Sequence, residues 1–133
     1  MSADIQPTAP VSTKLIWAGR IVSALVVLVL LLSGGMKLTK GEQVVEGFKH
    51  LGYPETVILA IGVVEVTCAI VYAIPQTAVI GAILITGYLG GATATHVRLG
   101  EPFWGPIVLG MIAWLGLFLR DARIRALIPL RKL

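Results

Sequence analysis

Four apolar stretches, separated by short polar segments, dominate the pattern of the sequence. They cover residues 15–35, 56–74, 77–97 and 103–119, and none holds more than one Asp, Glu, Lys or Arg. A helix rises about 1.5 Å per residue, so about 20 apolar residues are enough to cross the hydrocarbon core of a bilayer. The pattern therefore predicts an all-α fold, a transmembrane four-helix bundle whose membrane domain spans residues 15–120.

The segment between the first two stretches has the pattern of a short amphipathic helix, which we expect over residues 40–51. Thr39 and Glu42 have the spacing of a capping box at its start, and Gly52 and Pro54 are typical of its end. The apolar stripe of this helix consists of Val44, Val45, Phe48 and Leu51. Such an interfacial helix lies either in the headgroup region of the outer membrane surface or over the mouth of the bundle.

The chain ends predict the orientation in the membrane. Residues 1–14 are polar and contain two prolines, which is typical of a flexible arm, and residues 121–133 form a basic tail. Four crossings place both ends on one side, which carries seven Lys or Arg residues against four on the opposite side. The positive-inside rule therefore places both termini in the cytoplasm.

Composition supports a membrane protein and excludes other classes. Charged residues make up 14% of the chain, against about 25% in soluble proteins, and 56% are hydrophobic. The net charge is +4, and many of the basic residues flank an apolar stretch. This placement argues against nucleic acid as a partner and indicates membrane lipid as the partner instead. One Cys and two His are too few for a disulfide or for a zinc or di-iron site, so we expect no metal.

One acidic residue, Glu65, lies near the centre of the second stretch. A charge is costly at that depth, so Glu65 is expected to face the interior of the bundle and to be protonated or paired. It shares a helical stripe with Gly62, Ala69 and Tyr72. Two interpretations remain open: a ligand-binding or proton-transfer site that includes Gly62 and Tyr72, or a neutral acid that joins helices through hydrogen bonds.

The third stretch offers polar groups at the same depth. Counted from the outer ends of the two stretches, Glu65 is level with Thr86 to Tyr88, which are its expected partners. Candidate ligand contacts on this stretch are Thr86, Tyr88, Thr93 and His96, and Thr86, Gly90, Thr93 and His96 form a rough stripe. Gly87 and Gly91 have GxxxG spacing, which favours close packing with another helix. If that helix belongs to a second copy of the chain, the two copies form a homo-oligomer.

His96 and Lys37 are expected near the outer end of the bundle, close to Arg98 and Glu101. Such a cluster could bind an anion, a quinone headgroup or a partner subunit, with the imidazole as a proton carrier. Equally, a histidine at the end of a helix complements the helix dipole, and Lys37 can extend along the helix to reach the interface.

Three short motifs resemble the DoxX-like family of membrane proteins, over about residues 15–119. The motifs are SGGMKL at 33–38, LGYP at 51–54 and IGVVE at 61–65. The resemblance implies a four-helix bundle in the bacterial inner membrane. The named member of this family is the small subunit of a thiosulfate:quinone oxidoreductase, and relatives associate with membrane complexes of sulfur or oxidative-stress chemistry. The family's lysine and acid map onto Lys37 and Glu65.

Three functions are compatible with these observations. The leading hypothesis is an accessory or binding subunit of a membrane redox complex that holds a quinone or another small amphiphile at Glu65, Tyr88 and His96. The second is an intramembrane enzyme that uses Glu65 and His96 for proton transfer on an apolar substrate, as an isomerase or cyclase does. The third is a structural protein that associates through Gly87 and Gly91. No redox-cofactor motif is identifiable in the sequence, which argues against an independent oxidoreductase. A quinone is the candidate cofactor of the leading hypothesis.

Overall fold

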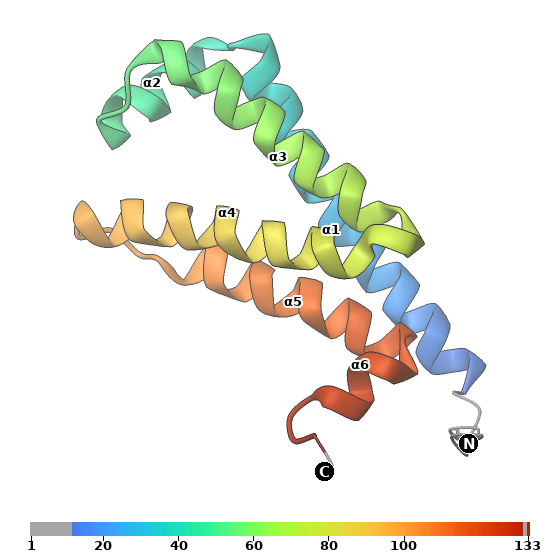
Figure 1. Cartoon of the computed structure of the whole chain (residues 1–133). Coiled ribbons are helices and arrows are strands. Elements are labelled where there is room, and N and C mark those ends of the chain that lie inside the picture. Colours follow the sequence, from blue (N-terminus) through green and yellow to red (C-terminus); the bar gives the residue numbers. More distant parts are fainter. Residues whose placement is uncertain (1–11, 132) are drawn as a thin grey trace.

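The computed structural model describes residues 12–131 and 133, and its elements are helices (Figure 1). In chain order they are α1 (Thr13–Thr39), α2 (Glu42–Leu51), the 3-10 turn η1 (Glu55–Val57), α3 (Ile58–Ala73), the 3-10 turn η2 (Pro75–Thr77), α4 (Ala78–Arg98), α5 (Trp104–Arg120) and α6 (Ala122–Leu127). No strand occurs in the described residues, and the all-α prediction is confirmed.

The four longest helices pack around one apolar core. α1 contacts α3 and α5, and α4 contacts the same two helices, so α1 and α4 occupy opposite corners of the bundle. The core side chains come from all four of these helices; they include Leu30, Ala69, Ile85 and Leu117. This ring order is the one in which consecutive antiparallel helices lie side by side, as short connections favour.

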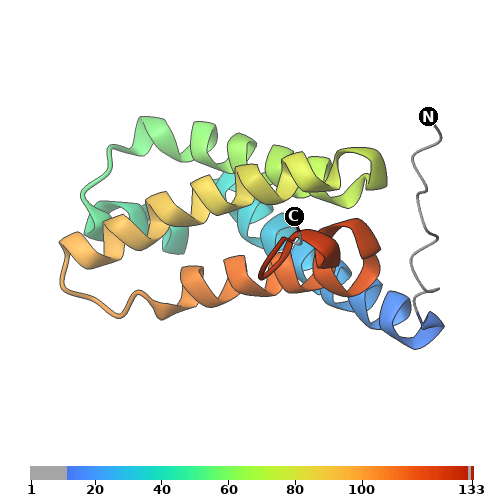
Figure 2. The same cartoon turned by 60° about the horizontal axis from the view of Figure 1, so that its bottom comes forward.

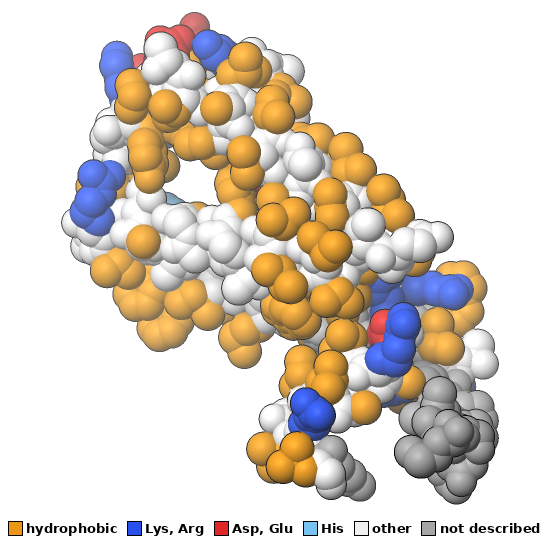
Figure 3. All heavy atoms as spheres, viewed as in Figure 1, with side chains coloured by type: hydrophobic (Ala, Val, Ile, Leu, Met, Phe, Trp, Pro, Cys, Tyr) orange, Lys and Arg blue, Asp and Glu red, His pale blue; other side chains and the backbone are white. Residues whose placement is uncertain are grey.

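The surface of the bundle is apolar. Within the described residues, three helical segments are long and apolar enough to cross a membrane: Thr13–Thr39, Glu55–Ala73 and Pro75–Arg98; α5, with 17 residues, is a shorter apolar helix. Large side chains such as Ile83 and Met111 are more than half exposed, and hydrophobic atoms cover much of the visible face (Figure 3). Lipid is the solvent that such a surface requires, so the predicted helical membrane bundle is confirmed.

The bundle is tight at one end and open at the other. Where the chain turns from α3 into α4, Gly81 lies so close to Tyr72 that a Cβ on Gly81 would overlap the Tyr72 backbone. Pro75 begins the η2 turn that joins the two helices there. Away from this turn, α3 and α4 diverge toward the end where α2 lies, as two views show (Figures 1 and 2).

Two predicted features of the first connection are wrong. α1 continues to Thr39 instead of ending at residue 35, and the Thr39 hydroxyl donates to a carbonyl of α1 itself. The expected capping box is therefore absent, since α2 begins at Glu42 after Gly41 with no side-chain cap. The predicted end of α2 is confirmed, because Gly52 follows the helix in the left-handed conformation with a φ of +81°.

The chain ends also differ from the prediction. Residues 1–11 of the expected arm lie outside the described residues, and α1 has already begun at residue 13. In the expected basic tail, Ala122–Leu127 forms α6, which packs against α5. The Asp121 carboxylate caps α6 by accepting the Arg123 backbone N–H at 2.9 Å.

Candidate functional site

Small residues let α1 and α3 approach closely near the open end of the bundle. A Cβ on Gly34 of α1 would lie 2.6 Å from the Val66 side chain of α3, and a Cβ on Gly62 would lie 2.9 Å from the Lys37 Cβ. Side chains next to this crossing therefore meet their neighbours on the other helix. Gly62, expected as a ligand contact, instead allows the two helices to pack.

An ion pair between Lys37 and Glu65 joins the two helices beside this crossing. The distance between Lys37 Nζ and Glu65 Oε2 is 2.6 Å, and Nζ also donates to Ser33 Oγ at 2.7 Å. The Glu65 side chain is 3% exposed and the Lys37 side chain 14%. A buried carboxylate requires a partner, and the expectation that Glu65 faces the interior and is paired agrees with this geometry.

The identity of that partner differs from the sequence prediction. The expected partners were Thr86 to Tyr88 on the third stretch, but the ion pair is formed with the first helix. Because α1 extends beyond residue 35, Lys37 lies on a continuous helix that faces α3, and not in a loop. Tyr88, one of the expected partners, instead lines the same cavity as Lys37.

A cavity of about 680 Å³ lies at the open end of the bundle, among α1, α2, α3 and α4. Its lining comprises Ser33, Met36, Lys37, Val44, Gly47, Phe48, Leu51, Tyr53, Ile61, Gly87, Tyr88, Gly91, Ala92, Thr95 and His96. The volume is in the range of small-molecule sites, and the lining is mostly apolar with a few polar groups. Lys37, Tyr88 and His96 reach the cavity as expected, whereas Glu65 lies behind Lys37 and is not part of the lining.

Helix α2 covers the mouth of this cavity. Three of its four predicted stripe residues, Val44, Phe48 and Leu51, line the cavity, so the stripe faces the bundle mouth. Phe48 packs against Tyr53 with ring centroids 6.0 Å apart, and the Tyr53 and Thr95 hydroxyl oxygens are 2.8 Å apart. In the space-filling view the surface is open between α2 and α4, with hydrophobic atoms around the opening (Figure 3).

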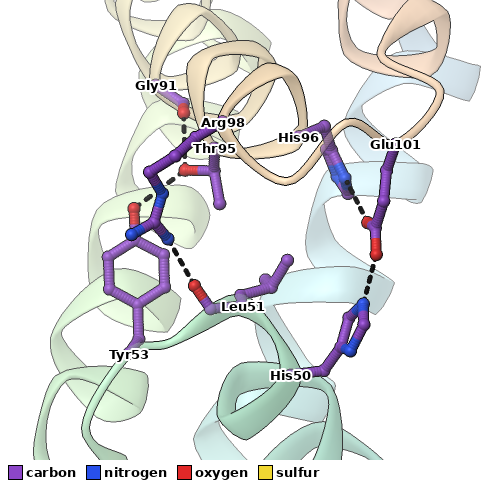
Figure 4. A network of polar contacts seen from close by, with 8 residues as sticks. All are labelled: His50, Leu51, Tyr53, Gly91, Thr95, His96, Arg98 and Glu101. Atoms are coloured by element: carbon purple, nitrogen blue, oxygen red, sulfur yellow. Dashed lines mark hydrogen bonds and ion pairs between the residues drawn. The ribbon is translucent and has the colours of Figure 1, made fainter.

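A second set of polar contacts holds α2 against the end of α4 (Figure 4). The Glu101 carboxylate lies between two histidines: Oε1 pairs with His50 Nε2 of α2, and Oε2 lies 3.2 Å from His96 Nδ1 of α4. The Arg98 guanidinium donates to the Leu51 carbonyl at the end of α2. Of the cluster of Lys37, His96, Arg98 and Glu101 expected from the sequence, the last three therefore join α2 to the bundle, whereas Lys37 pairs with Glu65.

Docking of α2 is expected to depend on the charge of Glu101. Hydrogen bonds from His50 and His96 lower the pKa of Glu101 below its ordinary value of 4.5. With a lowered pKa, the ionised carboxylate stabilises docking above pH 4.5, and this stabilisation is lost as the pH falls through the lowered value. We expect α2 to move away from α4 in acid, measured as a longer distance between spin labels at Gln43→Cys and Val97→Cys.

The control for this experiment is Glu101→Gln, which removes the titrating group. All labelled proteins carry Cys68→Ala, because Cys68 is the native cysteine. The Glu101→Gln protein should give a distance that no longer changes with acid. A wild-type distance that stays constant from pH 7 to pH 3 would show that Glu101 does not hold α2 in place.

Tyr72 belongs to the opposite, tight end of the bundle. Its hydroxyl donates to the Ala113 carbonyl at 2.7 Å and lies 3.0 Å from the Ser23 hydroxyl. The Arg120 guanidinium lies over its ring, 5.4 Å from the centroid. Tyr72 is fully buried and its hydroxyl is satisfied within the protein, so its expected role as a ligand contact is replaced by packing among α1, α3 and α5.

The two threonines expected to contact a ligand do not line the cavity. Thr86 accepts a hydrogen bond from Trp114 Nε1 of α5 at 2.8 Å and donates to the Ala82 carbonyl. Thr93 donates to the Leu89 carbonyl, one turn earlier in its own helix. Both hydroxyls are therefore satisfied locally. Of the predicted stripe of Thr86, Gly90, Thr93 and His96, it is His96 that lines the cavity.

Gly87 and Gly91 line the cavity instead of packing against another helix of the described chain. A Cβ on either residue would meet nothing within 4 Å. Sequence reasoning missed the contributions of Tyr53 and Thr95, whose hydroxyls join the connection between α2 and η1 to α4. The LGYP motif could have identified Tyr53 as a site residue, because it places an aromatic side chain at the mouth of the bundle.

Comparison with known proteins gives one family match. The model of the DoxX-like family matches residues 21–118, a range that contains the Lys37–Glu65 pair and every residue of the cavity lining. The match confirms the family resemblance seen in the sequence motifs. No curated protein and no solved structure matches the chain.

Proposed function

The chain belongs to the DoxX-like family, and from this premise we propose that it is a multi-pass membrane protein whose cavity binds a quinone or another small amphiphile. The cavity itself is the observation that carries the proposal. Its mostly apolar wall suits a hydrocarbon or isoprenoid tail, and Lys37, Tyr88 and His96 offer polar contacts for a headgroup. Tyr88 and His96 are eight residues apart on α4, which spreads these contacts over about 12 Å along the helix.

The proposed topology has four crossings, with α5 as the fourth. Its 17 residues are at the lower limit for a spanning helix, and Arg120 at its end is followed by the basic residues of α6. Both termini then lie on one side, which the positive-inside rule assigns to the cytoplasm of a bacterial inner membrane. α2 and the cavity mouth lie on the opposite side in this arrangement.

The proposed role in the cell is that of an accessory subunit associated with a membrane redox complex, as the family resemblance implies. The cavity would then hold a quinone close to a partner subunit that carries the redox centre. A partner helix or a second copy of the chain at Gly87 and Gly91 is a competing proposal, because the open space beside these glycines belongs to the cavity and a helix packed there would exclude the ligand.

An intramembrane enzyme is less well supported. That hypothesis requires Glu65 and His96 to reach the same substrate atoms. Glu65 is held by Lys37 and does not line the cavity, and His96 Nδ1 faces Glu101. The geometry therefore favours binding over proton transfer by these two residues.

Gly91→Leu tests the proposed binding function. A leucine at this position projects into the open space of the cavity. Gly90→Leu makes the same change on the neighbouring residue, which is outside the lining and where an added Cβ meets nothing within 4 Å. We expect quinones and other amphiphiles, extracted from the purified proteins and measured by mass spectrometry, to be retained by wild type and Gly90→Leu and lost from Gly91→Leu. Equal retention in both variants would contradict binding in this cavity.

A further inference from the structure

We propose that the cavity selects amphiphiles with an uncharged carbonyl headgroup, whose oxygen accepts a hydrogen bond from the Lys37 ammonium. This inference rests on the proposed function, since it names the class of ligand that the same cavity takes. It follows from a count of hydrogen-bond donors, from the charge balance around Lys37 and from the partners of the neighbouring polar groups.

The Lys37 ammonium has one donor to spare. A lysine ammonium carries three N–H groups and accepts none. One of them points to Glu65 Oε2 and one to Ser33 Oγ, and no other acceptor takes a hydrogen bond from Nζ within the described part of the chain. Because Lys37 lines the cavity, an occupant of the cavity can accept the third N–H, and a bare hydrocarbon would leave it unsatisfied.

The charge of Lys37 is already neutralised. Glu65 lies 2.6 Å from Nζ on the side away from the cavity, so the pair presents a donor without a net charge. A carboxylate ligand would place a second negative charge next to the buried Glu65 carboxylate, with one ammonium between them. The ligand carboxylate and the Glu65 carboxylate would repel each other strongly, because the site is poorly solvated and the two charges share one ammonium. A neutral acceptor avoids this cost.

The other basic side chains near the cavity do not offer a free positive charge to its occupant. His96 Nδ1 lies beside the Glu101 carboxylate, and the Arg98 guanidinium donates to the Leu51 carbonyl. Arg98 is not among the residues that line the cavity, and His96 already faces a carboxylate, so neither balances an anionic headgroup there. Tyr88 offers a hydroxyl group to the cavity. A ketone, ester or quinone carbonyl therefore fits the polar groups of this cavity, and a fatty acid does not.

The test compares three probes of equal chain length: a methyl ketone, a fatty acid and an alkane. Each is radiolabelled, and its binding to the protein in lipid nanodiscs is measured with empty nanodiscs as the blank. We expect the ketone to bind wild type at least about tenfold more tightly than either other probe, the usual effect of a hydrogen bond to a charged donor. Lys40→Met, at an exposed lysine outside the lining, serves as the control and should bind the ketone like wild type.

Two variants of the ion pair separate the effect of the Lys37 ammonium on binding from the effect of its counter-ion, Glu65. Lys37→Met combined with Glu65→Leu removes both charges together, which keeps the helices packed, and is expected to lose the preference for the ketone while alkane binding stays. Glu65→Gln keeps the ammonium but removes its counter-ion, and is expected to improve fatty acid binding at least about tenfold.

The outcomes separate the two proposals. If the fatty acid binds wild type as tightly as the ketone, or if the double variant keeps full ketone preference, the carbonyl inference is wrong and the binding function stands. If none of the three probes binds above the empty nanodiscs, the binding function itself fails, and the inference fails with it.

Discussion

Glu65→Gln is expected to lower the free energy of unfolding by about 3–5 kcal/mol, the usual cost of removing one partner from a buried ion pair. The Lys37 ammonium would remain in the bundle without its counter-ion, with Ser33 as its remaining partner. Solvent screens this pair little, because the Glu65 side chain is 3% exposed. Reversible unfolding by SDS in mixed micelles, followed by circular dichroism, measures the change.

The double variant Lys37→Met with Glu65→Leu shows whether charge is the cause. Apolar replacements of both partners leave no buried charge, so most of the stability lost in Glu65→Gln should return. Asp121→Asn is the control for a surface ion pair. Its partner Arg123 is 90% exposed at the side chain, so loss of this pair should change the free energy of unfolding far less than Glu65→Gln does. A loss below 1 kcal/mol in Glu65→Gln, or no recovery in the double variant, would contradict this account.

The helical stripe around Glu65 was predictable from the sequence. Gly62, Glu65, Ala69 and Tyr72 share one face of any regular helix, and all four are buried in α3. The prediction rests on the high cost of a charge in lipid, which leaves one orientation for the helix. Sequence spacing did not give the roles of the four residues along that face, because the bundle is open at Glu65 and tight at Tyr72.

The orientation of α4 was not predictable in the same way. Its polar stripe through Thr86, Gly90 and Thr93 suggested an inward face, but the buried face consists of Ala78, Gly81, Ala82, Ile85, Leu89 and Thr95. In lipid, apolar character does not distinguish the inside of a bundle from its outside. Threonine hydroxyls can be satisfied by carbonyls one turn earlier in the helix, as Thr86 and Thr93 show. Small residues do not identify the inner face of α4 either, because Ala78, Gly81 and Ala82 are buried whereas Gly87, Gly90 and Gly91 are not packed against another helix.

The partner of Glu65 was missed because the end of α1 was placed too early. Hydropathy falls at Ser33–Gly34–Gly35, so the apolar stretch ends there although the helix continues to Thr39. Lys37 is thereby positioned by a regular helix, with its long side chain directed back toward α3. The family motif that contains Lys37 was the signal for this residue, but motif position alone does not give a partner.

The tight end of the bundle depends on one glycine. Gly81 of α4 packs on the backbone of Tyr72 in α3, and an added Cβ would overlap Tyr72 Cα and N. Backbone atoms cannot move aside as a flexible side chain can, so Gly81→Ala must force the two helices apart. We expect the free energy of unfolding to fall by about 3 kcal/mol or more, at the upper end for overpacked sites, measured by the same SDS titration.

Gly90→Ala is the matched control for Gly81→Ala, because it makes the same change in the same helix where nothing lies within 4 Å of the added Cβ. Alanine favours a helix over glycine, so Gly90→Ala should raise the free energy of unfolding by about 0.5–1 kcal/mol in place of lowering it. Opposite signs for the two variants would establish that contact with α3, and not helix propensity, sets the requirement for glycine at position 81. If Gly81→Ala proves as stable as wild type, α3 and α4 do not approach this closely at the η2 turn.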